Sequence, residues 1–134
     1  MTTAASPDKP TVTKGGATKA ASFKINESGR SVLVRVIGPL DLEHAPELLD
    51  RISPLCVSGR RVVLDLLQAD YVDSSGVRTI LQMQALLGTV RGELRLVIQA
   101  GSRVERVFSL LRLMDQLEIY RTVSAAWEGQ ASVS

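Results

Sequence analysis

One apolar run that passes directly into a helical pattern constrains this chain more than any other feature. Residues 61–67, Arg-Val-Val-Leu-Asp-Leu-Leu, form an apolar run of strand length, which predicts a buried strand. Apolar residues then recur at a spacing that fits one face of a helix, at Val77, Ile80, Leu81, Leu87 and Val90. The sequence therefore predicts a strand that leads into a helix spanning about residues 75–90.

Further strand and helix patterns precede this pair. Residues 23–26 and 31–37 predict a hairpin joined by turn residues 27–30, and Gly38-Pro39 ends its second strand. Asp41 then opens a helical stretch. Its apolar positions keep the helical rhythm at Leu42, Ala45, Leu48, Leu49 and Ile52.

The alternation continues after the central pair. Residues 93–98 predict another strand, and Gly101-Ser102 starts a helix. The apolar face of that helix comprises Val104, Val107, Phe108 and Leu111. Residues 118–120 predict a short edge strand, and residues 122–127 a last helix capped by Thr122 or Ser124.

Strands that alternate with helices imply right-handed crossovers and a parallel sheet, while the opening hairpin adds one antiparallel pair. The predicted fold class is therefore α/β: a mixed, mostly parallel sheet of four to five strands with about four helices packed on it. Residues 1–21 consist largely of Thr, Ala, Ser, Pro, Gly and Lys, which predicts a disordered N-terminal extension. Residues 22–134 are expected to form a single domain.

Several classes of protein are disfavoured by composition. No apolar run approaches the roughly 20 residues of a membrane-spanning helix, and the first residues lack the apolar core of a signal peptide, so we expect a cytoplasmic protein without membrane insertion. The single cysteine, Cys56, excludes an internal disulfide and is expected to be a packed thiol. A lone cysteine and a lone histidine do not form a metal-ligand cluster, and no cofactor is expected.

The basic isoelectric point comes from the N-terminal extension. The first 20 residues hold three of the 16 basic residues and one of the 14 acidic residues, which leaves 13 of each in the remainder. The remaining arginines are interleaved with acidic residues, and the aromatic residues are scattered. Because neither a basic stripe nor a stacking platform is visible, we expect no nucleic-acid partner.

The start of the central helix is the candidate functional site. Asp73 and Ser74 occupy positions typical of N-caps. The first amides of a helix lack intrahelical partners and carry the positive end of its dipole, which favours negative charge nearby. A phosphate group on Ser74 could therefore be accommodated there.

Residues 63–77, Val-Leu-Asp-Leu-Leu-Gln-Ala-Asp-Tyr-Val-Asp-Ser-Ser-Gly-Val, resemble the signature of the STAS domain, the fold of the bacterial anti-sigma factor antagonists. Gly38-Pro-Leu-Asp-Leu42 is similar to the Gly-x-Leu-Asp segment of that family. The resemblance extends from about Phe23 to Trp127.

The resemblance implies a protein switch rather than an enzyme. In such antagonists the serine after the motif aspartate, here Ser74, is phosphorylated by a partner that is both anti-sigma factor and serine kinase. The unphosphorylated antagonist binds that partner and frees the sigma factor, and a serine phosphatase resets the switch. Partner binding would involve Asp41, Asp73, Ser75, Gly76, Val77, Arg78, and the helix positions Thr79 and Gln82, which are expected to be exposed.

An alternative from another class remains open. Small STAS proteins also serve as adaptor subunits of lipid-transport ATPase complexes or of stress-sensing assemblies, without control by phosphorylation. Two residues also depart from the family pattern. Arg78 stands where glycine is frequent, and Arg112 stands in a small-Gly-Leu turn, where a left-handed backbone would be mildly strained.

Some residues have a structural interpretation beside the functional one. Ser74 could serve only as a cap, and both Asp73 and Asp41 could cap helices, while Asp73 could also orient the Ser74 hydroxyl. Asp65 in the buried strand should need a hydrogen-bond partner if it points inward. His44 could be imagined in a hydrolase triad with Ser74, but the chain has no Gly-x-Ser-x-Gly elbow. Trp127 is expected to cover the core.

Overall fold

The computed structural model describes residues 20–128, and the expected N-terminal extension falls almost entirely outside this range. The sheet has five strands in the order β1-β2-β3-β4-β5. They are β1 (Ser22–Ser28), β2 (Ser31–Leu40), β3 (Arg61–Val72), β4 (Glu93–Val97) and β5 (Glu118–Tyr120). β1 pairs antiparallel with β2, and the remaining neighbours are parallel. The predicted mixed, mostly parallel sheet is confirmed.

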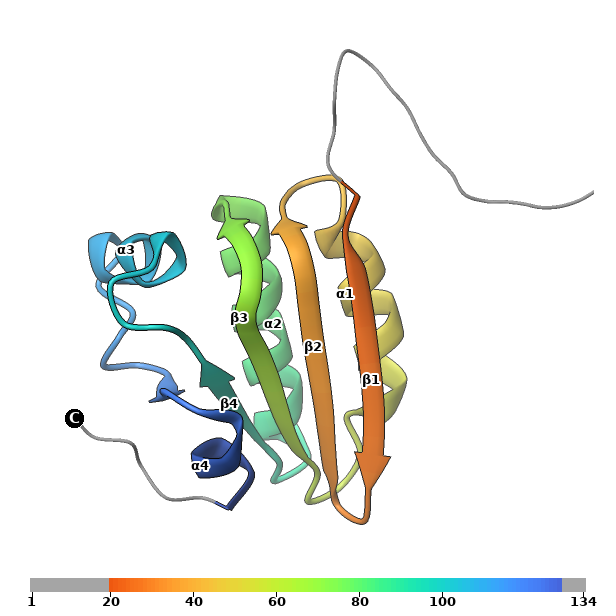
Figure 1. Cartoon of the computed structure of the whole chain (residues 1–134). Coiled ribbons are helices and arrows are strands. Elements are labelled where there is room, and N and C mark those ends of the chain that lie inside the picture. Colours follow the sequence, from red (N-terminus) through yellow and green to blue (C-terminus); the bar gives the residue numbers. More distant parts are fainter. Residues whose placement is uncertain (1–19, 129–134) are drawn as a thin grey trace, which may run out of the picture.

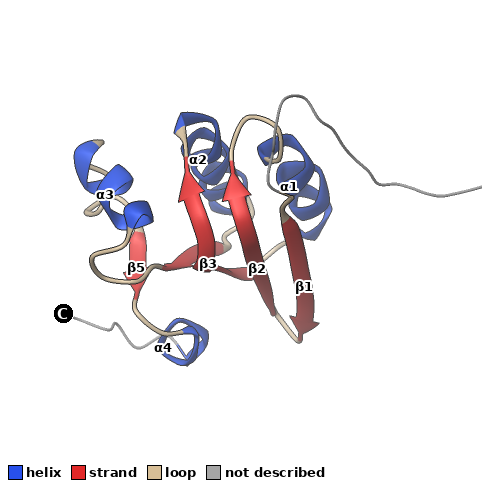
Figure 2. Cartoon of the chain, turned by 45° about the horizontal axis from the view of Figure 1, so that its top comes forward, coloured by secondary structure: helices blue, strands red, loops and turns tan. Residues whose placement is uncertain are grey.

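Helices cover the two faces of the sheet unequally. The helices are α1 (Ala45–Ile52), α2 (Ser74–Thr89), α3 (Arg103–Leu110) and α4 (Val123–Glu128), and a short 3-10 helix, η2 (Ser53–Leu55), follows α1. α1 and α2 lie side by side on one face, and α4 lies on the opposite face near β3 and β4 (Figures 1 and 2). α3 lies beyond the end of β4 and contributes Val104 and Phe108 to the main core.

The main core fills the layer between the sheet and the large helices. It contains the inward side chains of β2 and β3 together with Leu48 and Ile52 of α1 and Ile80 and Met83 of α2. A smaller cluster on the other face joins Val63, Val97, Tyr120 and Ala126, with Trp127 packed against it. The expectation that Trp127 covers the core is confirmed.

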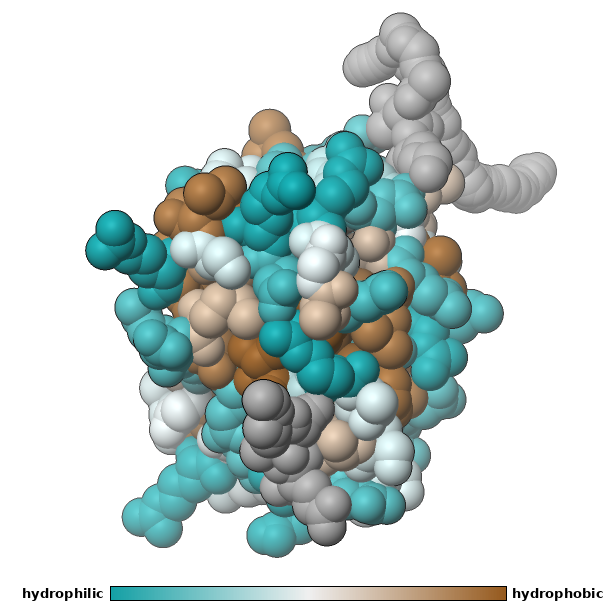
Figure 3. Space-filling model, turned by 60° about the vertical axis from the view of Figure 1, so that its left-hand side comes forward, coloured by the Kyte–Doolittle hydropathy of each residue, from teal (hydrophilic) through white to brown (hydrophobic). Residues whose placement is uncertain are grey.

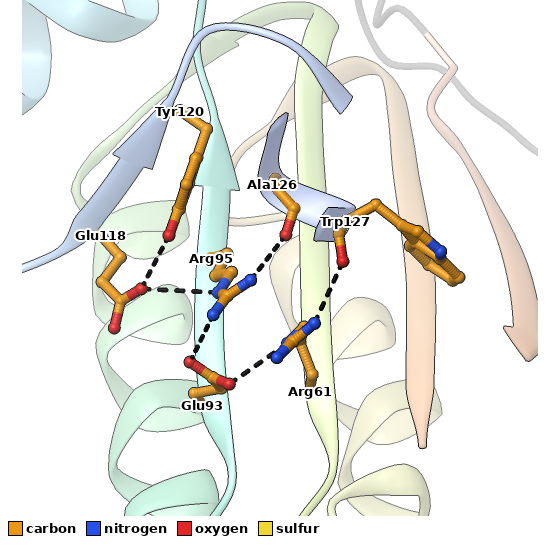
Figure 4. Close-up of polar contacts among 7 residues, drawn as sticks. All are labelled: Arg61, Glu93, Arg95, Glu118, Tyr120, Ala126 and Trp127. Atoms are coloured by element: carbon orange, nitrogen blue, oxygen red, sulfur yellow. Dashed lines mark hydrogen bonds and ion pairs between the residues drawn. The ribbon is translucent and has the colours of Figure 1, made fainter. Parts of the chain in front are cut away.

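Two arginines fasten α4 to the sheet (Figure 4). Arg95 donates from Nη1 to the carbonyl oxygen of Ala126 at 2.9 Å, and Arg61 donates from Nη1 to that of Trp127 at 3.0 Å. Both guanidinium groups also bind the carboxylate of Glu93, at 3.1 and 3.2 Å. The last carbonyl groups of a helix have no intrahelical partner and carry partial negative charge, so these cations stabilise the end of α4.

Polar and strained positions in the fold have local explanations. Asp65 is 2% exposed, and it accepts hydrogen bonds from Arg35 Nε and the Leu67 N–H, both at 2.9 Å, as its buried position required. Cys56 is partly buried, and burial raises the pKa of its thiol against the opposing charge of Arg60. Arg112 does adopt the left-handed conformation, with a φ of 59°, so the turn is kept despite the strain.

Two predicted boundaries at the end of β2 are wrong. The strand does not end at Gly38-Pro39 but continues to Leu40, because register shifts in the β2–β3 pairing let the strand pass these residues. The next helix does not start at Asp41 but at Ala45, because the Asp41 carboxylate binds the N–H groups of Glu43 and His44 and closes a turn instead. Leu42, expected on the apolar helix face, is therefore 71% exposed.

The side of the molecule that carries α3 shows hydrophobic side chains between hydrophilic ones (Figure 3). At the end of α3, Leu110 is 75% exposed, and the next residue, Leu111, is 50% exposed. Leu111 was expected on the buried helix face, but α3 ends at Leu110 and the chain turns at that point.

The glycines of α2 allow a direct test of the packing. A Cβ at Gly76 would lie 2.4 Å from the carbonyl oxygen of Leu40, whereas a Cβ at Gly88 would meet nothing within 4 Å. We expect Gly76→Ala to lower the free energy of unfolding by about 1–3 kcal/mol, because the clash involves backbone. Gly88→Ala should raise it by about 0.5–1 kcal/mol, because alanine is the better helix former. Urea denaturation measures both, and equal effects would contradict the close approach at Gly76.

Candidate functional site

The loops that follow β2 and β3 meet at one end of the sheet. Because β2 and β3 are parallel, their carboxyl ends lie together, and Leu40 is paired with Val72. Residues 41–44 lead from β2 into α1, while Asp73 alone connects β3 to α2. This end of the sheet, which carries Ser74, is at the top of Figure 1.

Asp73 is the N-cap of α2 and ties the two loops together. One carboxylate oxygen, Oδ1, accepts a hydrogen bond from the Gly76 N–H at 3.0 Å, as an N-cap residue does. The other, Oδ2, accepts from the Leu42 N–H at 3.2 Å. A single carboxylate therefore sets both the start of α2 and its distance from the β2–α1 loop.

Ser74 is the first residue of α2 and is exposed. Since Asp73 supplies the cap, the alternative in which Ser74 serves as the cap is wrong. Within residues 20–128 no side chain or backbone group forms a hydrogen bond with the Ser74 hydroxyl. The hydroxyl is thus free to react or to bind another molecule.

Asp41 organises the neighbouring loop. Its Oδ1 accepts from the N–H groups of Glu43 and His44, both at 3.1 Å, and lies 2.7 Å from Nδ1 of His44. Its Oδ2 accepts from the Tyr71 hydroxyl at 3.3 Å. The pKa of Asp41 lies below its ordinary value. Burial alone would raise it, but the hydrogen bonds that the carboxylate accepts and the charge of His44 together lower it by more. Asp41 closes this turn and does not cap α1 directly.

These side chains surround a shallow acidic hollow beside Ser74. It has a volume of about 380 Å³ and is lined by Asp41, Leu42, Glu43, Tyr71 and Asp73. The guanidinium group of Arg103 lies 6.0 Å from the centre of the Tyr71 ring. Burial and the charge of Asp41 raise the pKa of Tyr71.

Sequence reasoning missed three residues of the hollow: Leu42, Glu43 and Tyr71. Leu42 was assigned to the core because it fits a helical rhythm. A signal for the alternative was present, because Asp41 is a residue type that closes turns by binding nearby backbone N–H groups. Tyr71 precedes the buried Val72, and alternation along the strand points it to the other side.

The expected docking residues on α2 divide into two groups. Gln82 is exposed, as predicted, and Arg78 is also exposed, while Ser75 is partly exposed. Thr79, expected to be exposed, is only 5% exposed, and the side chain of Val77 is buried at 4%. Gly76 is buried against Leu40. The exposed surface of α2 is therefore narrower than the set of its polar residues, because the polar residue Thr79 is buried.

Arg78 has no ion pair or hydrogen bond with any side chain in the described part of the protein.

The described residues also contain no group of three or more metal-ligating side chains. His44 contacts Asp41, and no hydrogen bond joins it to Ser74 within residues 20–128. None of the described helices is both long and apolar enough to span a membrane.

Comparison with known proteins supports one family. A family model of the STAS domain matches residues 22–126. An anti-sigma factor antagonist from Mycobacterium paratuberculosis has a similar structure: it is 21% identical, the match covers 82% of this chain and 93% of that chain, and the TM-score is 0.73. No curated protein sequence matches.

Two structures of SpoIIAA are also similar. The phosphorylated form of this Bacillus cell fate determinant is 23% identical, with coverage of 81% of this chain and 98% of that chain and a TM-score of 0.60. The anti-sigma factor antagonist SpoIIAA in its unphosphorylated form is 18% identical, with coverage of 81% and 96% and a TM-score of 0.64. At these identities the likeness establishes the fold.

The division of work between Asp73 and Ser74 can be tested by thermal and urea denaturation. Asp73→Ala removes the cap and the bond to Leu42, so we expect it to lower the free energy of unfolding by about 1–2 kcal/mol. Ser74→Ala removes a hydroxyl without a partner in residues 20–128, so the change should stay within about 0.5 kcal/mol. A larger loss for Ser74→Ala than for Asp73→Ala would show that the cap has been assigned to the wrong residue.

Proposed function

The chain belongs to the STAS domain family, and from this we propose that it is an anti-sigma factor antagonist, a binding protein that sequesters a serine-kinase anti-sigma factor until Ser74 is phosphorylated. The observation that carries the proposal is the free, exposed hydroxyl of Ser74 beside a cap supplied by another residue. A serine phosphatase would restore the binding form, and the exchange would take place in the cytoplasm.

The surroundings of Ser74 suit a reversible phosphate. Phosphorylation adds about 1.5 to 2 negative charges near neutral pH. At the first turn of a 16-residue helix these charges meet the positive end of the dipole. Arg78 lies one turn along the same helix, close enough along the helix surface to attract the phosphate. The domain can therefore carry the group without unfolding.

The same group would oppose docking by a partner. It would lie next to the carboxylate of Asp73 and near the acidic hollow that contains Asp41 and Glu43. A partner surface complementary to the neutral serine would have to desolvate a dianion in an acidic setting. Loss of binding, rather than loss of folding, is the expected consequence.

The docking surface would continue from Ser74 along α2. Ser75, Arg78 and Gln82 supply its polar part. Further along, between α1 and α2, lies an apolar hollow of about 430 Å³ lined by Leu49, Gln82, Ala85, Leu86 and Thr89. Because Gln82 belongs to both regions, a partner could bury the apolar hollow while contacting Ser74. Buried Thr79 and Val77 would act by supporting this surface rather than by touching the partner.

The switch can be tested at Ser74. After incubation with ATP and a lysate of the source organism, mass spectrometry should locate one phosphate on Ser74, and Ser74→Ala should remain unmodified while Ser75→Ala is modified normally. A serine kinase identified in a pull-down should bind Ser74→Ala with wild-type affinity. It should bind Ser74→Asp about tenfold or more weakly, because a carboxylate then occupies the docking surface.

Melting curves of each variant provide the control for folding. Equal affinity of Ser74→Ala and Ser74→Asp for the identified kinase would refute the switch. Capture of an ATPase complex or a large assembly by both variants, with Ser74 unmodified, would favour the adaptor function instead.

Arg78 provides a second test of the docking surface. A cation in the first turns of a helix is unfavourable to the dipole, so Arg78→Ala should leave the melting temperature unchanged or slightly higher. Arg78→Glu should slow association with the kinase by about threefold to tenfold, and added salt should slow association of the wild type. Stopped-flow kinetics measure both effects.

The matched control is Lys24→Glu, the same reversal of charge at an exposed position on the other face of the sheet. Its association rate should stay close to that of the wild type. If Arg78→Glu binds as fast and as tightly as wild type, α2 does not form the docking surface.

A further inference from the structure

Three turns meet at the end of the sheet opposite Ser74, at the bottom of Figure 1. They are the β1–β2 turn at 29–30, the segment 58–60 before β3, and the segment 90–92 before β4. Together with the first residues of β2, β3 and β4 they enclose a hollow of about 350 Å³. Its lining consists of Arg30, Ser31, Gly59, Arg61, Arg91 and Glu93.

The charge in this hollow is unbalanced. Three arginines and one glutamate, Glu93, line it, which gives a formal net charge of +2. Glu93 is already bound by Arg61 at 3.2 Å and by Arg95 at 3.1 Å (Figure 4). Within residues 20–128 neither Arg30 nor Arg91 has a hydrogen bond or an ion pair through its side chain. Two of the three arginines that line this hollow therefore have no counter-charge in the described part of the protein.

The turns that carry these arginines are held together by backbone hydrogen bonds. The Arg61 N–H donates to the Arg30 carbonyl oxygen at 3.0 Å, and the Gly59 N–H donates to that of Val90 at 2.8 Å. The guanidinium group of Arg30 passes over Gly59, where a Cβ would lie 3.7 Å from Nη2. The backbone positions of the arginines are therefore fixed, and a ligand has only their side chains to order.

Arg91 occupies a backbone conformation that arginine does not favour. Its φ is 60°, in the left-handed region that suits glycine or asparagine. Its exposed side chain has no polar partner in the described part of the protein that would offset this strain. The conformation serves to end α2, since the Gly92 N–H donates to the Leu87 carbonyl oxygen at 2.7 Å, and the same pattern ends α3 at Arg112, where the Leu113 N–H donates to that of Phe108 at 2.9 Å. These hydrogen bonds involve only the backbone, so the Arg91 side chain is available to a ligand.

We propose that this hollow is an anion-binding site that takes the phosphate group of a small molecule, with Arg30 and Arg91 as the main ligands and Ser31 as a further hydrogen-bond donor. A planar guanidinium group can donate two parallel hydrogen bonds to two oxygens of one phosphate group, and a net charge of +2 matches a phosphate dianion. The volume exceeds that of a bare ion and falls at the low end for small-molecule sites, which leaves room for an organic part. The site lies at the other end of the sheet from Ser74 and does not depend on the proposed function.

The experiment is an NMR titration of the full-length, nitrogen-15-labelled protein with inorganic phosphate, at constant pH and constant ionic strength. The amide signals of Ser31, Gly59 and Arg91 should shift and saturate, while those of Ser74 and Gly76 stay in place. Glycerol 3-phosphate should bind at least as tightly as inorganic phosphate, because the hollow has room for the ester.

Arg91→Gly separates binding from folding. It removes one guanidinium group, so phosphate affinity should fall about tenfold or more. It also relieves the left-handed strain, so the melting temperature should rise. Arg30→Gln should weaken binding to a similar degree, whereas Arg106→Gln, at an exposed arginine on α3, should not.

Shifts that do not saturate, or wild-type affinity in Arg91→Gly, would overturn the site. A fall in the melting temperature of Arg91→Gly would overturn it as well, because the arginine would then serve the fold. Binding of inorganic phosphate about tenfold more tightly than the ester would exclude a phosphorylated small molecule as the ligand.

Discussion

The arrangement at Ser74 depends on how closely the first turn of α2 approaches the end of β2. A Cβ at residue 76 would lie 2.4 Å from the Leu40 carbonyl oxygen and 2.7 Å from Cγ1 of Val72, so only glycine fits without displacement. At this separation the Asp73 carboxylate reaches the N–H groups of both Gly76 and Leu42. The cap is thereby complete without Ser74, whose hydroxyl is left for chemistry with other molecules.

The distribution of charge gives the domain two unlike ends. Acidic side chains gather where β2 and β3 end, and arginines gather where the same strands begin. Residues 21–134 contain equal numbers of basic and acidic residues, so their net charge is zero and does not reveal this separation in space. The acidic end would attract cationic ligands and the basic end anionic ligands. The length of β2 and β3 separates the two ends.

The sequence predicted the order of strands and helices well, because buried strands and amphipathic helices leave strong periodic signals. The predictions were wrong where one side chain changes the local backbone geometry. At Asp41 a carboxylate binds backbone N–H groups and delays the helix, which exposes Leu42. At Thr79 the error has another cause: α2 packs against both α1 and the sheet, so its buried arc is wider than its apolar stripe. The hollow with three arginines could not be predicted, because it joins turns far apart in the sequence.

The strand order β1-β2-β3-β4-β5 follows the order of synthesis. Each strand after the first therefore finds its partner already made as the chain leaves the ribosome, and no strand has to wait for a distant segment to close a long loop. Every residue that shapes the Ser74 loop through Asp73 and Asp41 is present once α2 has been synthesised up to Thr89. The arginine contacts that fasten α4 belong to a later stage, because their acceptors at Ala126 and Trp127 are among the last residues of the domain to be translated.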